Sequence, residues 1–196
     1  MDRIVLKTIG QIQLPAVAKI LQNKTIMKTY MVPDLTDEDA LSLARRLADL
    51  SLDKNRYVRG IYRGEQLIGF INDTGIEKYT IELGWVIHPE FHNRGFATAA
   101  VRLAIRELFD IGFQKIIAGA FEQNIPSRRV MEKCGMVRLE LTDEIEYRGQ
   151  CHHCVYYGIT SCERIDPLTW FRKPLLYPLS YRCNIDIISK LLQLVK

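Results

Sequence analysis

A short glycine-containing turn has the residues expected of an anion-binding site. Residues 92–98 read His-Asn-Arg-Gly-Phe-Ala-Thr, between an apolar strand-like run at 80–87 and an amphipathic stretch at 97–110. At the start of a helix, free backbone N–H groups and the helix dipole favour a phosphate without needing any particular side chain. Gly95 would let the backbone approach the anion closely. The spacing also fits an ordinary strand–turn–helix connection, so the turn alone leaves both interpretations open.

A second segment further along the chain favours the phosphate interpretation. Residues 124–136 read Asn-Ile-Pro-Ser-Arg-Arg-Val-Met-Glu-Lys-Cys-Gly-Met. Together the two segments resemble the GNAT superfamily of acetyl-CoA-dependent N-acetyltransferases. Residues 92–97 are similar to its pyrophosphate loop, and residues 124–136 to its Asn-x-x-Ser/Ala…Glu-Lys-x-Gly-Phe segment. The resemblance covers residues 59–160 and is strongest to the branch that contains ribosomal-protein N-terminal (alanine) acetyltransferases and their small-molecule relatives.

The resemblance implies acetyl-CoA as cosubstrate and a set of residues that would bind it. Backbone amides of the 92–98 turn would hold the pyrophosphate, and the end of the preceding strand would present its backbone to the pantetheine arm. Asn124 would hydrogen-bond that arm, and Arg128 or Arg129 could reach the nucleotide phosphate. The implied set is Trp85, Val86, Ile87, His92, Asn93, Arg94, Gly95, Phe96, Ala97, Thr98, Asn124, Ser127 and Arg128.

The residues that would move protons are Glu82 and Ser127. Relatives often place a carboxylate just ahead of Leu-Gly-Trp/Tyr, where Glu82 stands, and it could accept the proton of the acceptor ammonium through water. A solvated strand carboxylate is the alternative. Many relatives protonate the leaving thiolate with a tyrosine at the position of Met131, so that acid is absent here. Ser127, Cys134 and water are the possible substitutes.

Two positions of the 92–99 region depart from the family pattern. His92 replaces the usual Gln or Arg, and either contacts a phosphate or lies in solvent. Ala99 stands where relatives of this branch often carry Glu, so any role of that carboxylate is missing.

Residues 151–154, Cys-His-His-Cys, have the composition of a metal site but not the geometry. On a strand, successive side chains point to opposite faces, so these four cannot converge on one ion. We therefore expect no metal site.

The chemistry-bearing segments must be positioned by a mixed α/β fold. Periodicity predicts strands at 4–9, 57–62, 66–71, 79–88, 115–120, 137–142 and 151–160, with a polar turn at 73–78 and a hairpin turn at Arg148-Gly149. Helices are predicted at 14–22, from 36 with Thr36 as cap, at 97–109, and after Asn124 until Gly135. The resemblance implies the GNAT-type α/β (α+β) fold: one domain with a mixed, mostly antiparallel sheet flanked by helices.

The chain divides into a GNAT domain at 1–163 and a C-terminal extension at 164–196. The extension is proline-broken and apolar, then ends in a predicted amphipathic helix at 184–195. It either packs back on the domain or forms a dimer contact or a lid over the acceptor site, since exposed apolar patches often mark interactions.

Composition excludes several classes of protein. The chain has 196 residues, 47% of them hydrophobic, and a net charge of +4 without a dense basic run, so nucleic-acid binding is not indicated. We see no window that resembles a membrane span or a signal peptide. Five cysteines without a framework spacing favour a reduced, cytoplasmic protein.

The sequence therefore predicts an N-acetyltransferase that moves an acetyl group from acetyl-CoA to a primary amine by direct attack. The acceptor is an amine-bearing small molecule or a protein N-terminus. A ribosomal-protein N-terminus, a free amino acid, a polyamine and an aminoglycoside all remain open. The alternative is a GNAT-fold module that has lost catalysis and senses acyl-CoA or contacts a partner.

Overall fold

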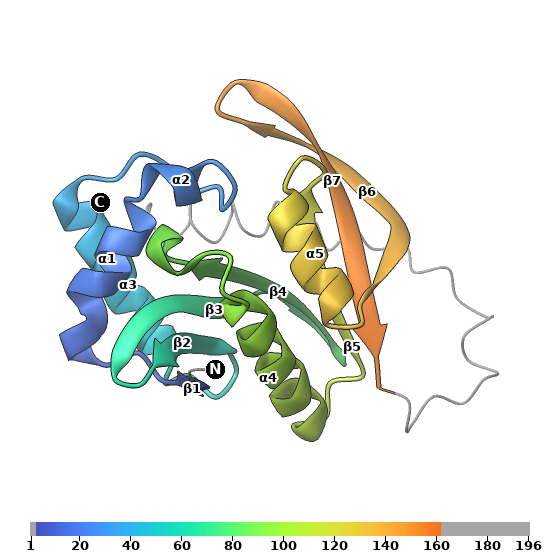
Figure 1. Ribbon diagram of the computed structural model, residues 1–196, viewed down its shortest axis with the longest axis horizontal. Helices are drawn as coiled ribbons and strands as arrows, with labels where there is room; N and C mark the ends of the chain where they lie inside the picture. The colour runs from blue at the N-terminus through green and yellow to red at the C-terminus, as the bar shows by residue number, and fades with distance from the viewer. Residues whose placement is uncertain (1–2, 162–196) are drawn as a thin grey trace.

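The computed structural model describes residues 3–161, which form a seven-stranded sheet flanked by helices (Figure 1). The strand order is β1-β2-β3-β4-β5-β7-β6. All neighbouring strands are antiparallel except β4 and β5, which are parallel. The strands are β1 Ile4–Lys7, β2 Val58–Arg63, β3 Gln66–Glu77, β4 Thr80–Ile87, β5 Lys115–Phe121, β6 Val137–Tyr147 and β7 Gln150–Thr160. This confirms the predicted mixed, mostly antiparallel sheet. The predicted helix at 184–195 and the extension at 164–196 lie outside the described residues.

The helices form two groups, one on each face of the sheet. Figure 1 shows α1 (Leu14–Leu21), α2 (Lys24–Met27) and α3 (Asp37–Leu50) together, with α4 (Phe96–Asp110) and α5 (Ile125–Lys133) beside each other elsewhere. The first group packs on Val58, Phe70 and Val86, whereas α4 packs on the opposite face, against Ile71 and Ile87 among others. Side chains alternate between the faces of a strand, so successive residues of β4 contact different helix groups.

Local capping fixes where the helices begin. Thr36 Oγ1 accepts a hydrogen bond from the Asp39 amide at 3.1 Å, and Asn124 Oδ1 accepts one from the Ser127 amide at 3.3 Å. Both caps are as predicted. A polar side chain at this position satisfies an amide that has no partner within the helix. Among the described residues no helix is long and apolar enough to span a membrane.

The predicted polar turn at 73–78 is wrong, because β3 continues through it to Glu77. Asp73 is only 2% exposed; its carboxylate accepts a hydrogen bond from the Tyr57 amide at 2.8 Å and pairs with the Arg56 guanidinium at 2.7 Å. A buried charge is tolerated when it is paired and hydrogen-bonded. The polar residues that suggested a turn are therefore satisfied inside a strand, beside a register shift between Asp73 and Gly75.

The hairpin between β6 and β7 is longer than predicted. β6 runs on to Tyr147, and the turn falls at Arg148 and Gly149, which have φ of 52° and 71°. The turn was predicted correctly. The continuation of β6 beyond residue 142 was not predicted, because charged residues such as Glu144 and Glu146 occupy its exposed positions.

Candidate active site

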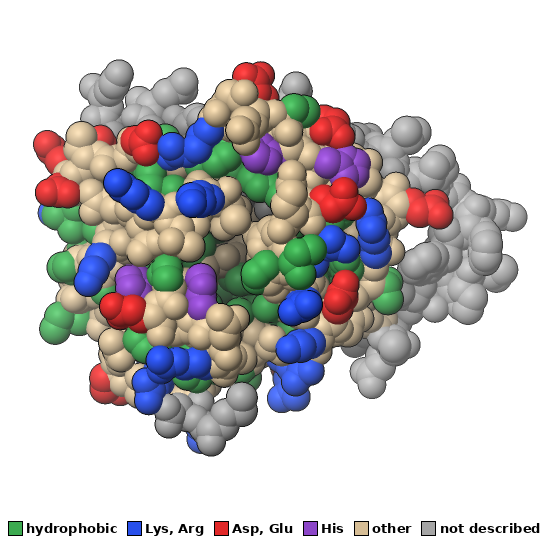
Figure 2. Space-filling view, turned by 45° about the horizontal axis from the view of Figure 1, so that its top comes forward, with side chains coloured by type: hydrophobic (Ala, Val, Ile, Leu, Met, Phe, Trp, Pro, Cys, Tyr) green, Lys and Arg blue, Asp and Glu red, His purple; other side chains and the backbone are tan. Residues whose placement is uncertain are grey.

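A cavity opens where strands β4 and β5 separate. The two strands pair only from Thr80 to Glu82 with Lys115 to Ile117. Beyond that point lies a cavity of about 730 Å³. Its walls are β4, the turn before α4, α5, and residues 24–31, which comprise α2 and the loop after it and are called the α2 segment below. Figure 2 shows this side of the molecule, with Lys and Arg side chains around a central hollow. The parallel pair therefore forms a fork whose open end faces the cavity.

The turn before α4 lines one end of the cavity and has the features of an anion-binding site. Gly95 has a left-handed φ of 77°, and α4 begins immediately after it with no side chain capping its first amides. The first turn also contains no acidic residue. Free amides at the positive end of a 15-residue helix thus face the cavity. Of the predicted set, His92, Asn93, Gly95, Phe96, Ala97 and Thr98 line it.

Arg94 differs from its neighbours in the turn. It is absent from the cavity lining, and its guanidinium lies 5.9 Å from the centre of the Phe91 ring. Its side chain is thus occupied outside the cavity, and any contact with an anion would come from its backbone.

His92 connects the turn to the end of β4. Its Nε2 lies 2.7 Å from the Ile87 carbonyl oxygen. Since a carbonyl only accepts, Nε2 must carry the hydrogen and Nδ1 is the nitrogen without one in the neutral ring. The structure therefore gives His92 a positioning contact as well as a place in the cavity wall.

The backbone of β4 supplies the second wall. Trp85, Val86 and Ile87 line the cavity as predicted, and they lie past the last residue of β4 that pairs with β5. On their other side they pair with β3. The edge toward the cavity is therefore available to hydrogen-bond an extended ligand, in the manner of an added strand.

Helix α5 brings one of its two adjacent arginines to the cavity. Asn124, Ser127, Arg129 and Lys133 line the cavity, but Arg128 does not. Instead Arg128 donates to the Tyr157 hydroxyl at 3.3 Å and to the Glu122 carbonyl at 3.0 Å. Consecutive helical residues point about 100° apart, so only one of the two arginines can face the cavity. Of the two arginines that the sequence left open for the nucleotide phosphate, Arg129 is the one beside the cavity.

Of the residues weighed as proton donor, only Ser127 reaches the cavity. Met131 is fully buried in the core below α4. Cys134 is absent from the lining; its thiol lies 3.6 Å from the Thr98 carbonyl oxygen, and burial raises its pKa to about 11.

Glu82 is a buried carboxyl at the base of the fork. It is 2% exposed, and burial first, with the nearby Asp143 carboxylate second, raises its pKa to about 8. The adjacent Thr74 hydroxyl opposes this rise only in part. Neither Thr74 Oγ1 nor Glu82 Oε2 has a hydrogen-bond partner of normal geometry within residues 3–161. The carboxyl is therefore not a solvated strand residue.

Gly84 is the residue of the cavity wall nearest to Glu82 on the same face of β4. The two residues share a face of β4, and Gly84 lines the cavity. A Cβ at Gly84 would lie 3.2 Å from the Thr74 methyl and 3.5 Å from the Tyr30 ring. With only hydrogen there, no side chain of residue 84 lies between the cavity and the Thr74 methyl.

The raised pKa of Glu82 predicts how stability depends on pH. Between the pKa of the unfolded chain and about 8, the folded protein keeps Glu82 protonated while the unfolded chain ionises, so wild-type stability falls as pH rises through this window. Gln carries no charge. We expect Glu82→Gln to raise the melting temperature relative to wild type more at about pH 9 than at about pH 5. Thermal unfolding measured at both pH values would show this, and an equal difference at both would contradict it.

The α2 segment forms a wall that the sequence did not indicate residue by residue. Thr25, Ile26, Thr29 and Tyr30 line the cavity, opposite α5. The Tyr30 hydroxyl donates to Asn72 Oδ1 at 2.5 Å. The Asn23 cap ahead of α2 is the only local signal, because nothing else in 24–31 follows a motif.

The four residues at 151–154 separate as expected for a strand. His152 stacks on Phe121 at 4.3 Å, whereas Cys151 and His153 both contact Glu144 on the other face. Cys154 is buried. Within residues 3–161 no three metal-binding side chains come together.

Comparison with known proteins agrees with this geometry. Residues 3–137 match the family model described as an acetyltransferase (GNAT) domain. An uncharacterised N-acetyltransferase of Bacillus subtilis (strain 168), YnaD, is 33% identical over 128 residues, which are 63% of this chain and 72% of that protein.

Two solved structures have the same fold. A spermidine N-acetyltransferase from Vibrio cholerae, in complex with CoA and spermine, has a TM-score of 0.70 at 20% identity, over 82% of this chain and 96% of that one. A ribosomal-protein-S5-alanine acetyltransferase from Vibrio fischeri has a TM-score of 0.71 at 14% identity, over 83% and 96%. At these identities the likeness is one of fold.

Proposed function

This chain belongs to the acetyltransferase (GNAT) domain family, and on that premise we propose that it acetylates the primary amine of a small molecule or a protein N-terminus. It is an acetyl-CoA-dependent N-acetyltransferase; its acceptor and the roles of its residues are the proposal. One observation supports these roles above all. The free edge of β4 and the uncapped start of α4 line one cavity, and the buried carboxyl of Glu82 lies behind its wall, two residues before Gly84 on the same strand.

The residues present fit acetyl-CoA along the length of the cavity. The amides at the start of α4 hold the diphosphate, and the Arg129 and Lys133 side chains add positive charge at the same end. The Asn124 side chain and the edge of β4 hydrogen-bond the pantetheine arm. A backbone N–H near Val86 or Ile87 polarises the thioester carbonyl, as an oxyanion hole does.

Glu82 takes the proton that the acceptor must lose. The bound acetyl group supplies the electrophilic carbonyl carbon, to which the acceptor nitrogen bonds as the C–S bond breaks. Before the attack, one proton of the ammonium passes to ionised Glu82, through the Thr74 hydroxyl or a water; the second proton, which the nitrogen loses as the amide forms, goes to the leaving thiolate by way of Ser127. A pKa of about 8 suits this task, because a base works best when its pKa is near the operating pH.

Ser127 is the proposed donor to the leaving thiolate. A thiolate has a pKa only slightly above neutrality, so a dedicated acid contributes little. We therefore expect Ser127→Ala to lower kcat by less than about tenfold. Steady-state rates with the best acceptor would measure this, and a loss of several hundredfold would show that the serine is essential.

A thiol-release assay over four kinds of acceptor tests the proposed function. The panel is spermidine, a peptide with an N-terminal alanine, free amino acids and an aminoglycoside, each with saturating acetyl-CoA. Turnover of one class would identify the acceptor. Binding of acetyl-CoA by calorimetry without turnover of any acceptor would instead favour an acyl-CoA sensor.

The fold neighbours do not choose among these acceptors. One is a spermidine enzyme and the other a ribosomal-protein enzyme, yet their TM-scores, 0.70 and 0.71, are nearly equal. The choice depends on the wall formed by the α2 segment.

A further inference from the structure

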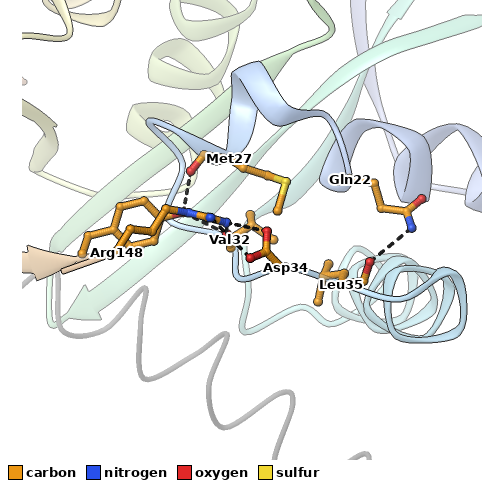
Figure 3. A network of polar contacts seen from close by, with 7 residues as sticks. Gln22, Met27, Val32, Asp34, Leu35 and Arg148 are labelled. Atoms are coloured by element: carbon orange, nitrogen blue, oxygen red, sulfur yellow. Dashed lines mark hydrogen bonds and ion pairs between the residues drawn. The ribbon is translucent and has the colours of Figure 1, made fainter. Parts of the chain in front are cut away.

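A single tyrosine at the tip of the β6–β7 hairpin holds both ends of the loop that follows α2. The Tyr147 hydroxyl contacts the carbonyl oxygens of Met27 and Val32, the latter at 2.9 Å. A phenol has one hydrogen to donate, so the two carbonyls share it. Figure 3 shows the Met27 and Val32 ends of the loop converging on this point. The contact joins segments far apart in sequence and closes residues 28–31 into a loop.

Arg148 adds a second attachment beside the first. Its guanidinium makes a two-pronged contact with the Asp34 carboxylate, at 2.9 and 3.4 Å (Figure 3). It also lies 3.4 Å from the Val32 carbonyl oxygen and donates from Nε to the Tyr147 hydroxyl at 3.0 Å. The same contact lowers the pKa of Asp34. Arg148 thus orients the Tyr147 hydroxyl and also binds the chain at Val32 and Asp34, just after the loop.

The loop held in this way carries part of the cavity wall. Thr29 and Tyr30 line the cavity, and the Tyr30 hydroxyl donates to Asn72, whose Oδ1 lies beside Gly84. Met31 follows with a left-handed φ of 56° and is 2% exposed, packed against Ile145 and its neighbours on β5 and β7. A non-glycine residue keeps such a backbone only where surrounding contacts enforce it.

We propose that Tyr147 and Arg148 are positioning residues for the acceptor. They hold the 28–31 loop so that Thr29 and Tyr30 face the β4 edge, and the acceptor amine is aligned with the acetyl group and Glu82. The proposal rests on the proposed function. It assigns the hairpin tip an effect on the acceptor half of the cavity and none on the acetyl-CoA half, whose walls are α4, α5 and β4.

Two substitutions at the hairpin tip differ in expected effect. Tyr147→Phe removes a hydrogen bond to buried carbonyls, worth about 1 kcal/mol or more, so kcat/KM for the acceptor falls about fivefold or more. Arg148→Ala breaks a partly exposed ion pair, and the expected loss is about two- to fivefold. If Arg148 acts through Asp34, Asp34→Ala combined with Arg148→Ala loses no more than Arg148→Ala alone.

The control is Arg138→Ala. Arg138 lies on β6, the strand that ends at Tyr147, and its side chain forms an exposed ion pair with Glu122 at 3.3 Å. This ion pair does not involve residues 28–31. We expect Arg138→Ala to leave both the acceptor kcat/KM and the acetyl-CoA KM at the wild-type value. The KM for acetyl-CoA should stay unchanged in all variants. A substitution that perturbs the whole fold would instead be expected to change this KM as well.

The experiment has a second arm that needs no acceptor. Hydrogen exchange of the backbone amides in 28–32 should be faster in Tyr147→Phe than in wild type, with exchange in α4 unchanged. The inference is overturned if exchange in 28–32 does not change, or if exchange rises while the acceptor kcat/KM stays at wild type. It is also overturned if the acetyl-CoA KM rises as much as the acceptor KM. Failure of wild type to acetylate any panel acceptor would instead count against the proposed function.

Discussion

Replacing Glu82 by Gln is expected to lower kcat by about 100-fold or more while leaving acetyl-CoA affinity unchanged, since a positioned general base contributes about 10²- to 10⁴-fold. The substitution keeps the size of the side chain and removes its capacity to take a proton. Glu82 is absent from the cavity lining itself, so the walls that contact acetyl-CoA are unaffected. Calorimetric titration and thiol release on the same preparation measure the two quantities.

The pH dependence of wild type should identify the same group. Because the base is the ionised carboxylate and the pKa of Glu82 is about 8, kcat should rise as the pH increases through that value. The Asp143 carboxylate helps to raise this pKa, so Asp143→Asn should move the rise to lower pH. A rise that persists unchanged in both Glu82→Gln and Asp143→Asn would mean that another group, or the acceptor amine itself, is titrating.

Replacing Gly95 by Val should weaken acetyl-CoA binding about 30-fold or more, because a β-branched residue in a left-handed conformation costs about 2 kcal/mol. Gly95 has φ of 77° and immediately precedes the first turn of α4. Valine would relieve this strain in the free protein by shifting the turn, so the amides would leave their place at the cavity and binding would have to restore the strained conformation. The dissociation constant from calorimetry is the relevant measurement.

Gly112 offers a matched control at the other end of the same helix. It has φ of 106° and open space around it, and it is not part of the cavity. Gly112→Val should therefore lower stability through the same backbone strain while leaving the acetyl-CoA dissociation constant unchanged. Equal losses of affinity in both variants would contradict the assignment of the Gly95 turn to the phosphates.

The two helix starts that line the proposed cofactor half of the site could be predicted from sequence because their determinants are local. A glycine before a helix and a capping Asn before the next one act within a few residues of themselves, and both Gly95 and Asn124 are where they were expected. The choice between Arg128 and Arg129 could not be made in this way. A motif assigns a position in the chain, but the phase of the helix decides which of two adjacent arginines faces the cavity, and here it is Arg129.

The acceptor half could not be predicted because its determinants are distant in sequence. Tyr147 contacts Met27 and Val32, and Tyr30 contacts Asn72, across separations that no local pattern records. The burial of Glu82 also depends on tertiary packing, since the sequence was compatible with a solvated carboxylate. The polar run at 73–78 was misinterpreted for the same reason: Arg56 supplies the charge that lets Asp73 lie inside a strand.

The most direct test of this account is the rate of thiol release by wild type and by Glu82→Gln, each saturated with acetyl-CoA and supplied with the best acceptor of the panel. The account predicts that both proteins bind acetyl-CoA equally and that only wild type turns over at an appreciable rate. Comparable turnover by the two proteins would contradict it, because the carboxyl at the base of the fork would then have no part in the proton transfer.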